Sequence, residues 1–289
     1  MTTTVAAPAP TRRPARRRID WSSPVVYVIA LAAIAVAIVP VIYVILGGFR
    51  SNGQLAAKPV GMPDPWIFEN YANVLTSPEF WRQVFNSAMT AIFTTLGVVI
   101  IGVMAAYVLA RYEFKGREAL NTFFTLGLLF PLGVAILPLY FMVRNLGLLG
   151  SLWGLIIPQI AFSLPITIVI LRPFLRAIPA ELEDASALDG CSRVGFFWRI
   201  LLPLSGPVLV TVGVLSFVMS WNAYLLPLLV LSDPASFTLP LGVQAFSSQY
   251  SQDTAAILAF TSLAMLPAIA FFTLAERRIV GGLQGAVKG

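Results

Sequence analysis

The sequence predicts an all-α polytopic membrane protein with six transmembrane helices, and three observations lead to this fold class. Of the 289 residues, 58% are hydrophobic and only 11% are charged, whereas about 25% are charged in ordinary soluble domains. The charged residues gather in short connectors between apolar stretches that contain none. Each stretch reaches the roughly 20 residues that a helix needs to cross about 30 Å of hydrocarbon. A β-barrel would instead show alternating segments of about ten residues.

The six spans follow from the chain in order. Residues 1–23 are basic and rich in Thr, Ala and Pro, and we expect a disordered cytoplasmic tail. The apolar run after them is longer than the 7–15 residue core typical of a signal peptide, so we interpret it as an uncleaved first span. A charge at mid-membrane costs about 2.5–3.5 kcal/mol, which favours charge-free spans. The predicted spans are 25–48, 84–110, 120–143, 152–171, 206–231 and 255–275.

The orientation follows from the positions of the basic residues. With the N-terminus inside, fifteen of the 19 basic residues lie on the cytoplasmic side and four lie outside. The positive-inside rule therefore places both termini in the cytoplasm. The same topology accounts for the net charge of +6, so no nucleic-acid partner is expected. We divide the chain into a tail 1–23, a six-helix transmembrane domain 24–275 with a cytoplasmic connector at 172–204, and a cytoplasmic tail 276–289.

Proline is frequent within the predicted spans. Membrane helices tolerate proline where neighbours satisfy the freed carbonyl groups. One interpretation is therefore kinked packing, and the other is hinging during a transport cycle. These prolines are Pro40, Pro131, Pro138, Pro158, Pro165, Pro207, Pro227 and Pro267.

The absence of three residue patterns excludes whole classes of chemistry. The chain has no histidine and a single cysteine, Cys191. A histidine-based metal site, a cysteine-pair redox site and a Ser-His or Cys-His nucleophile are therefore excluded. No lysine lies in the Gly-x4-Gly-Lys-Ser/Thr pattern of a phosphate-binding loop. The sequence predicts a non-catalytic membrane subunit that binds no cofactor or metal of its own.

The connector between the fourth and fifth spans carries the most informative pattern. Pro179 suits the first position of a helix, and the acidic residues after it complement the positive end of the helix dipole. Gly190 suits a helix stop. Ser192 can cap a second short helix that ends at Pro203. An alternative is an amphipathic helix that rests on the membrane surface, which suits Phe196–Trp198.

The small residues of the first connector helix and its turn, Ala185, Ser186 and Gly190, permit a close approach by another protein, and four residues of this helix share one face. The face is defined by i, i+3, i+4 and i+7 spacing. Its members are Leu182, Ala185, Ser186 and Asp189.

The connector resembles a known signature. Its run Asp184-Ala-Ser-x3-Gly190-x9-Ile-x-Leu-Pro203 is similar to the Glu-Ala-Ala-x3-Gly-x9-Ile-x-Leu-Pro motif of inner-membrane permease subunits of binding-protein-dependent ABC importers. It departs by Asp for Glu and by Ser for the second Ala, both conservative in size. Further matches over about residues 60–289 resemble the shorter, second permease of the maltose type. They are Phe68–Tyr71, Asn86-Ser87, Ala106–Arg111, Phe114–Arg117, Leu137–Tyr140, Leu146–Leu148, Trp221-Asn222, Pro227-Leu228, Leu239–Gly242, Gly282-Leu283 and Gly285–Gly289.

The resemblance implies a subunit of the bacterial plasma membrane that forms half of the translocation pathway for a sugar, a polyol or an oligosaccharide. The implied partners are a second related permease, two ATPase subunits that bind ATP and Mg²⁺, an extracytoplasmic solute-binding protein and the lipid bilayer. The connector helix would dock in a groove of the ATPase, and the C-terminal tail would reach toward the ATPase dimer. The implied coupling residues are Leu182, Glu183, Asp184, Ala185, Ser186, Leu188, Asp189, Gly190, Phe197, Leu202 and Pro203, and the tail residues are Gly282, Leu283 and Lys288.

Polar residues within the spans are the candidates for a substrate pathway. Ser220, Trp221, Asn222 and Tyr224 stand out, because an aromatic plane beside an amide can stack on a sugar and form hydrogen bonds with it. The alternative for the aromatic residues is a belt at the outer membrane interface. The alternative function is an ion-coupled secondary transporter of a small solute. That function predicts an ionisable group within the membrane, whereas every Asp and Glu lies in a connector or tail.

Overall fold

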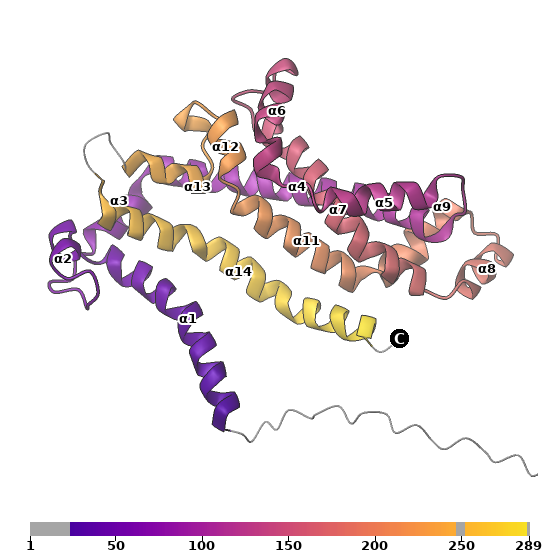
Figure 1. Ribbon diagram of the computed structural model, residues 1–289, viewed down its shortest axis with the longest axis horizontal. Coiled ribbons are helices and arrows are strands. Elements are labelled where there is room, and N and C mark those ends of the chain that lie inside the picture. The colour runs from indigo at the N-terminus through magenta and orange to yellow at the C-terminus, as the bar shows by residue number, and fades with distance from the viewer. Residues whose placement is uncertain (1–23, 247–251, 288–289) are drawn as a thin grey trace, which may run out of the picture. The chain divides into compact units, whose positions relative to one another are not determined.

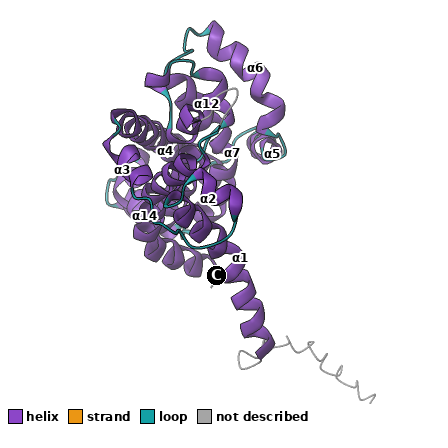
Figure 2. Ribbon diagram, turned by 90° about the vertical axis from the view of Figure 1, so that its left-hand side faces the viewer, coloured by secondary structure: helices purple, strands orange, loops and turns teal. Residues whose placement is uncertain are grey.

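The computed structural model describes residues 24–246 and 252–287, with side chains described as far as residue 273. Every regular element in these residues is helical, and Figure 2 draws no strand among them. This confirms the all-α class that the sequence predicts. The predicted tail 1–23 lies outside the described residues. The chain divides into two compact units, residues 1–43 and 44–289.

Four of the described helices are long and apolar enough to cross a membrane, and two bent pairs of helices also reach this length. The described residues therefore contain four to six candidate spans, depending on whether each bent pair crosses as one. The single helices are α1 (Pro24–Gly48), α4 (Pro78–Arg111), α7 (Trp153–Ala177) and the part Thr254–Thr273 of α14 (Thr254–Val287). The bent pairs are α5 (Arg117–Gly127) with α6 (Leu132–Asn145), and Arg193–Leu204 with α11 (Gly206–Trp221).

The third predicted span, 120–143, is not one straight helix. α5 and α6 meet at an angle of 103°. Pro131 stands at the N-cap of α6 with an extended backbone (φ −73°, ψ 133°). Proline has no N–H to donate and disfavours helical backbone at the residue before it, so α5 ends ahead of this position.

The fifth predicted span, 206–231, is also interrupted. α11 ends at Trp221, and a short helix, α12 (Leu225–Val230), follows after three residues. Asn222 caps the end of α11, because both its backbone N–H and its side-chain Nδ2 donate to the carbonyl of Val218. The ring of Pro227 would meet the carbonyl of Ala223 in a continuous helix. The chain therefore turns after α11.

The core of the second unit is built on α4, which packs against both α7 and α11, while α14 packs along α11 (Figure 1). α4 and α7 approach closely where glycines of α4 face side chains of α7. A Cβ added at Gly97 would overlap Ile160, and a Cβ added at Gly102 would overlap Thr167.

The shorter elements are α2 (Asn52–Ala57), α3 (Glu69–Thr76), α8 (Glu181–Leu188), α9 (Arg193–Phe196), the π-helical turn η1 (Phe197–Leu201), α10 (Leu202–Leu204), α13 (Leu239–Gly242), and the 3₁₀ turns η2 (Pro234–Ser236) and η3 (Val243–Phe246).

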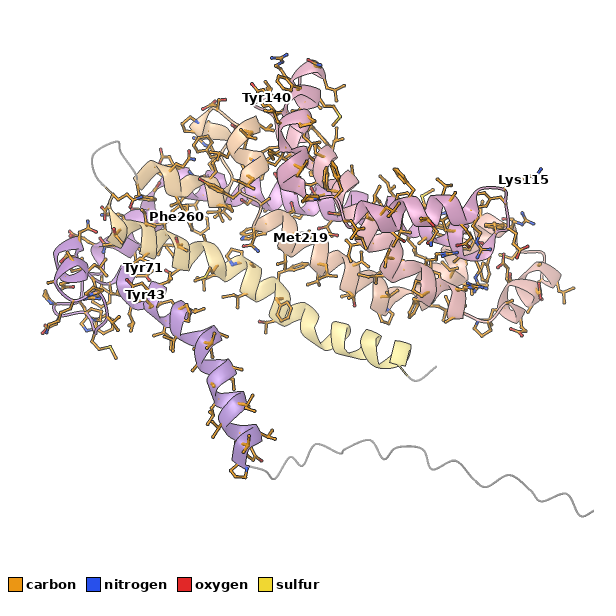
Figure 3. The ribbon with its side chains drawn as sticks, viewed as in Figure 1. Tyr43, Tyr71, Lys115, Tyr140, Met219 and Phe260 are labelled. Atoms are coloured by element: carbon orange, nitrogen blue, oxygen red, sulfur yellow. The ribbon has the colours of Figure 1, made fainter. Side chains whose placement is uncertain are left out.

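Two opposite ends of the second unit differ in what they carry. Lys115 and α8 lie at one end, and Tyr71 of α3 lies at the other (Figure 3). At the Tyr71 end, the buried Arg50 donates to the carbonyls of Gln54, Lys58 and Pro59, which fastens the loop after α1. The long helix α4 runs between the two ends, from the end of α3 to Arg111 (Figure 1).

Candidate functional site

The connector helix α8 begins and ends as its local sequence dictates. Three acidic residues occupy its first turn, where they complement the positive end of the helix dipole. The first helical residue is Glu181, two residues after Pro179. The prediction that Pro179 takes the first helical position is therefore wrong. Gly190 has a φ of +77°, which confirms the predicted stop. The N–H of Cys191 donates to the carbonyl of Ser186 at 2.9 Å, a bond that closes this left-handed turn.

The outer face of α8 is exposed and partly apolar. Leu188 is 91% exposed and Leu182 is 41% exposed, and Asp184, Ala185 and Asp189 are exposed beside them. The outer face of α8 therefore presents two leucines among small and acidic residues.

Ser186 departs from the predicted outer face. It is buried, and its Oγ donates to the carbonyl of Glu183 at 2.8 Å. Its small side chain therefore packs within this chain. Of the four residues of that predicted face, Leu182, Ala185 and Asp189 are the exposed ones.

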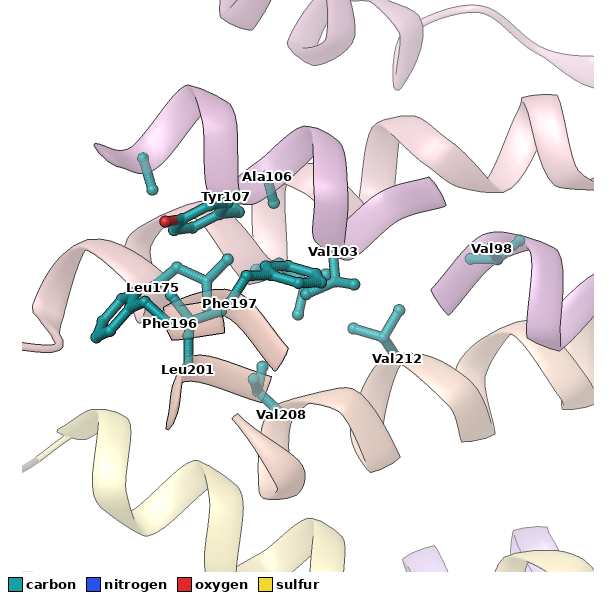
Figure 4. Close-up of a cluster of buried hydrophobic side chains, with 12 residues drawn as sticks. Val98, Val103, Ala106, Tyr107, Leu175, Phe196, Phe197, Leu201, Val208 and Val212 are labelled. Atoms are coloured by element: carbon teal, nitrogen blue, oxygen red, sulfur yellow. The ribbon is translucent and has the colours of Figure 1, made fainter. Parts of the chain in front are cut away.

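The second part of the connector is anchored in the protein core. The Oγ of Ser192 accepts a hydrogen bond from the N–H of Gly195 at 3.1 Å, which confirms the predicted cap of α9. Phe196, Phe197 and Leu201 are buried. Figure 4 shows these side chains among others from α4, α7 and α11. Their neighbours in this cluster are Val98, Val103, Ala106, Tyr107, Ala110, Leu171, Leu175, Val208 and Val212.

Phe197 therefore positions the connector instead of lying on its surface. Its ring centroid is 5.3 Å from that of Tyr107 on α4, and the side chain is 6% exposed. The adjacent Trp198 is 55% exposed. Of the last two predicted coupling residues, Leu202 is half-buried and Pro203 is exposed. Pro203, which offers no N–H, lies in α10, two residues after the end of the π-helical turn η1.

Two arginines tie the base of the connector to the helices around it. Arg111, at the end of α4, donates to the carbonyl of Ile178 at 2.6 Å. Arg172 of α7 donates to the carbonyl of Leu109 at 3.2 Å and forms a 2.6 Å ion pair with Glu118. These bonds satisfy carbonyls that are left open at helix ends. Arg111 ends one of the matches that carry the resemblance, and Arg172 opens the connector, but no local pattern predicted these bonds.

The residues predicted for a substrate pathway separate into two groups. Ser220, Asn222 and Tyr224 line one cavity of about 340 Å³. Trp221 does not line it and is only 4% exposed. Its Nε1 donates to the carbonyl of Ala264 at 3.2 Å, and its ring stacks on another aromatic ring of α11. In this structure Trp221 is a core residue between α11 and α14.

Sequence reasoning did not select Gln159, which lies on α7 and lines the same cavity. It is a single polar residue inside an apolar run, and no motif includes it. Met219, labelled in Figure 3, lines the cavity from α11. The cavity therefore joins residues from α7 and α11 that are about 60 positions apart in the chain.

Two of the motifs that carry the resemblance hold the structure together at the end opposite α8. The Nδ2 of Asn86 donates to the carbonyls of Ala235 and Phe237, each at 3.0 Å. The Oγ of Ser87 accepts the N–H of Leu239 at 2.8 Å. These bonds fasten the segment after α12 to α4.

Two predictions fall at the edges of the described residues. The predicted tail 276–289 is helical as far as Val287, as a continuation of α14. The side chains of Gly282 and Leu283 lie outside the described part, and Lys288 lies outside it entirely. Within the described part, no group of three or more His, Cys, Asp or Glu residues could hold a metal ion.

The sequence matches one protein family over most of its length. Residues 98–281 match the family described as the inner membrane component of binding-protein-dependent transport systems. The chain is 34% identical to a diacetylchitobiose uptake system permease protein of Streptomyces coelicolor, over 86% of this chain and 83% of that protein. It is also 34% identical to a trehalose transport system permease protein of Mycobacterium tuberculosis, over 95% of this chain and 99% of that protein.

Solved structures share the fold. A chain of a bacterial ABC transporter that imports the acidic polysaccharide alginate has a TM-score of 0.75 and 21% identity, over 88% of this chain and 95% of that one. The same transporter type in complex with an alginate pentasaccharide-bound periplasmic protein gives a TM-score of 0.62 and 15% identity, over 88% of this chain and 92% of that one.

Proposed function

The chain belongs to the family of inner-membrane components of binding-protein-dependent transport systems, and we propose that it forms half of the translocation pathway of a carbohydrate importer. As an ABC importer permease it is a non-catalytic, multi-pass membrane subunit, and ATP is hydrolysed by a separate subunit. The carbohydrate substrate is supported by relatives named for diacetylchitobiose and trehalose. No such support exists for the ion-coupled alternative.

The proposed topology has six spans, with both termini in the cytoplasm. It counts α5 with α6 as one span and α11 with α12 as another, and leaves Arg193–Leu204 in the cytoplasmic connector. The end of the second unit that carries Lys115, Arg111, Arg172 and α8 is then cytoplasmic, and the end that carries Arg50 is external. This assignment agrees with the excess of basic residues on the inner side.

We expect labelling with a membrane-impermeant maleimide to separate the two ends. The only native cysteine, Cys191, is first replaced by serine. Lys58 and Lys115 are both exposed, so Lys58→Cys and Lys115→Cys are matched reporters. Lys58→Cys should react in intact spheroplasts, and Lys115→Cys only after permeabilisation. Equal labelling of Lys115→Cys in intact spheroplasts would contradict the orientation.

The proposed coupling surface is the exposed face of α8, and its geometry is the observation that carries the function. α8 projects Leu182 and Leu188, ends at the left-handed Gly190, and is continuous with a segment anchored in the core by Phe196 and Phe197. Docking α8 into an ATPase groove would bury the apolar residues, and the anchored segment would carry the movement to α4, α7 and α11.

The proposed roles of the coupling residues follow their exposure. Leu182, Asp184, Ala185, Leu188, Asp189 and the exposed Pro203 are proposed contacts, whereas Glu183, Ser186, Gly190, Phe197 and Leu202 position the helix. Contacts of Gly282, Leu283 and Lys288 with the ATPase stay a proposal from the family resemblance.

The proposed partners are a second related permease, two ATPase subunits that bind ATP and Mg²⁺, and an extracytoplasmic solute-binding protein. The solved complex of an alginate transporter with its periplasmic protein supports the last of these. The same proposal divides the chain into a transmembrane domain, 24–275, and a cytoplasmic tail, 276–289.

Replacing Leu188 should weaken the attachment of the ATPase without unfolding this subunit. Burying one such aliphatic side chain contributes roughly 1.5–3 kcal/mol, so Leu188→Asn should lower the affinity by about tenfold or more. Co-purification of the ATPase in detergent measures the effect. Val194→Asn is the control, because Val194 is also exposed and lies on α9 of the same connector. Equal loss of the ATPase in both variants would argue against a specific α8 contact.

Reconstitution of the purified complex in proteoliposomes tests the function as a whole. With ATP and Mg²⁺ on the ATPase side and a sugar-loaded binding protein on the other, we expect uptake of trehalose or diacetylchitobiose that persists when ion gradients are collapsed. Uptake that needs a proton gradient and proceeds without ATP would instead establish the ion-coupled alternative.

A further inference from the structure

The cavity between α4, α7 and α11 has a mainly apolar lining with several polar side chains, none of them charged. Its volume of about 340 Å³ falls within the range of roughly 300–1,000 Å³ that is usual for small-molecule sites. Its thirteen lining residues include no Asp, Glu, Lys or Arg. They are Thr94, Leu132, Pro158, Gln159, Phe162, Ser163, Met219, Ser220, Asn222, Ala223, Tyr224, Leu225 and Leu226.

Two polar atoms of this lining are buried without a hydrogen-bond partner among the described residues. They are the Nε2 of Gln159 and the Oγ of Ser220. Ser220 is only 8% exposed. Buried polar groups are nearly always satisfied in folded proteins, and both of these belong to side chains that line one cavity. Both atoms are shielded in this structure, so a ligand in the cavity would bond to them once the side chains turn toward it.

The amide of Gln159 is held from one side. The Oγ1 of Thr94 on α4 lies 3.5 Å from its Oε1 and donates a long hydrogen bond to it. This contact leaves the Nε2 as the free donor of the side chain. A donor amide and a serine hydroxyl, which both donates and accepts, match the pattern of a sugar hydroxyl.

The remaining lining suits the apolar faces of a sugar ring. Phe162 and Tyr224 supply aromatic rings, and Met219 supplies an adaptable apolar chain. The hydroxyl of Tyr224 accepts a 3.4 Å hydrogen bond from Gln244, so the end of its side chain is also fastened.

We propose that this cavity is a binding subsite for an uncharged sugar during transport, and that Gln159, with Ser220, selects for ligand hydroxyl groups. The inference rests on the proposed carbohydrate function and names a site for it in this subunit. An anionic sugar is disfavoured, because its charge would be buried with no cation in the lining. Trp221, which is buried elsewhere, takes no part in the subsite.

The first test measures transport by the reconstituted complex with trehalose and diacetylchitobiose as probes. Gln159→Leu and Ser220→Ala should each lower the ratio of sugar imported to ATP hydrolysed by roughly three- to tenfold, as expected for one lost hydrogen bond. ATPase stimulation by the loaded binding protein and assembly of the complex should stay close to wild type.

Gln83→Leu is the matched control. Gln83 on α4 is also a buried glutamine with an unpartnered amide atom, its Oε1, but it does not line this cavity. An equal fall of the ratio in Gln83→Leu would show a general packing effect and overturn the subsite. An unchanged ratio in both cavity variants would overturn it as well.

The second test measures occupancy directly. With Cys191 replaced by serine, Ser220→Cys provides one thiol in the cavity, and alkylation by N-ethylmaleimide reports its access. Trehalose or diacetylchitobiose, presented on the binding protein during turnover, should slow the alkylation at least threefold, whereas free glucuronate should not. Equal rates with and without sugar in a complex that transports it would overturn the subsite alone. Failure of the wild-type complex to import either sugar would instead overturn the carbohydrate function, and the subsite with it.

Discussion

Replacing Gly190 by valine should abolish sugar uptake while the subunit still inserts and folds. Gly190 has a φ of +77°, and a Cβ added there would meet no atom within 4 Å. The variant therefore has space for its side chain, but valine disfavours the left-handed backbone conformation that this position requires. A left-handed residue costs roughly 1–2 kcal/mol for an ordinary side chain, and a β-branched one is a true outlier. The turn at the end of α8 should re-form with another geometry, and Leu188 should leave its docking position.

The measurement is ATP-driven uptake together with the ATPase rate of the purified complex. We expect uptake to fall by at least tenfold and the ATPase to lose its response to loaded binding protein. Gly190→Asn is the informative companion, because asparagine tolerates the left-handed region and should retain most uptake. Gly133→Val is the control for bulk at an open glycine, since a Cβ there also meets nothing within 4 Å. Wild-type uptake by Gly190→Val would refute the coupling role of this turn.

The positions of the long helices could be predicted from the sequence, because one physical term dominates them. A charge within the hydrocarbon is costly, so the charge-free stretches mark the apolar helices closely, as α4 and α7 show. The short connector could also be predicted, since its signals are local. Gly190 stops α8 and Ser192 caps α9, as their types and positions indicated.

The helix breaks could not be predicted, because proline acts through its surroundings. Pro138, Pro158 and Pro165 lie inside continuous helices, whereas Pro131 stands at the 103° bend between α5 and α6. In the first three cases the freed carbonyls are accommodated without a break. That difference depends on neighbouring helices, and no pattern along the chain records it.

The cavity was only half predicted, for a similar reason. Ser220, Asn222 and Tyr224 were selected by residue type near the end of α11, and they do line one cavity. Trp221, chosen by the same argument, points to α14, where its Nε1 donates to Ala264. Gln159 was missed because its significance arises only when α7 lies against α11. Residue type locates a polar region, but the packing of helices decides which side chains share a space.

The cavity and the coupling surface are connected through the same helices, so the anchoring of Phe197 in the core bears directly on coupling. α4, α7 and α11 contribute both the cavity lining and the cluster that holds Phe196 and Phe197. A movement of α8 can reach the cavity only if the connector moves as one body with this cluster. A loosened anchor should therefore break the coupling even where the ATPase still docks.

Phe197→Ala should uncouple the importer and destabilise the subunit. Truncating a buried phenylalanine costs roughly 3–5 kcal/mol, and Phe197 is only 6% exposed, with its ring 5.3 Å from that of Tyr107. We expect a lower thermal transition in detergent, retained co-purification of the ATPase and at least a tenfold loss of uptake per ATP hydrolysed. Trp198→Ala is the matched control, because this neighbouring aromatic residue is 55% exposed, and its loss should leave both stability and coupling close to wild type. Phe197→Leu should recover part of both, since it refills much of the same space. An equal response of the two alanine variants would show that aromatic bulk in the connector, and not its burial against α4, α7 and α11, determines coupling.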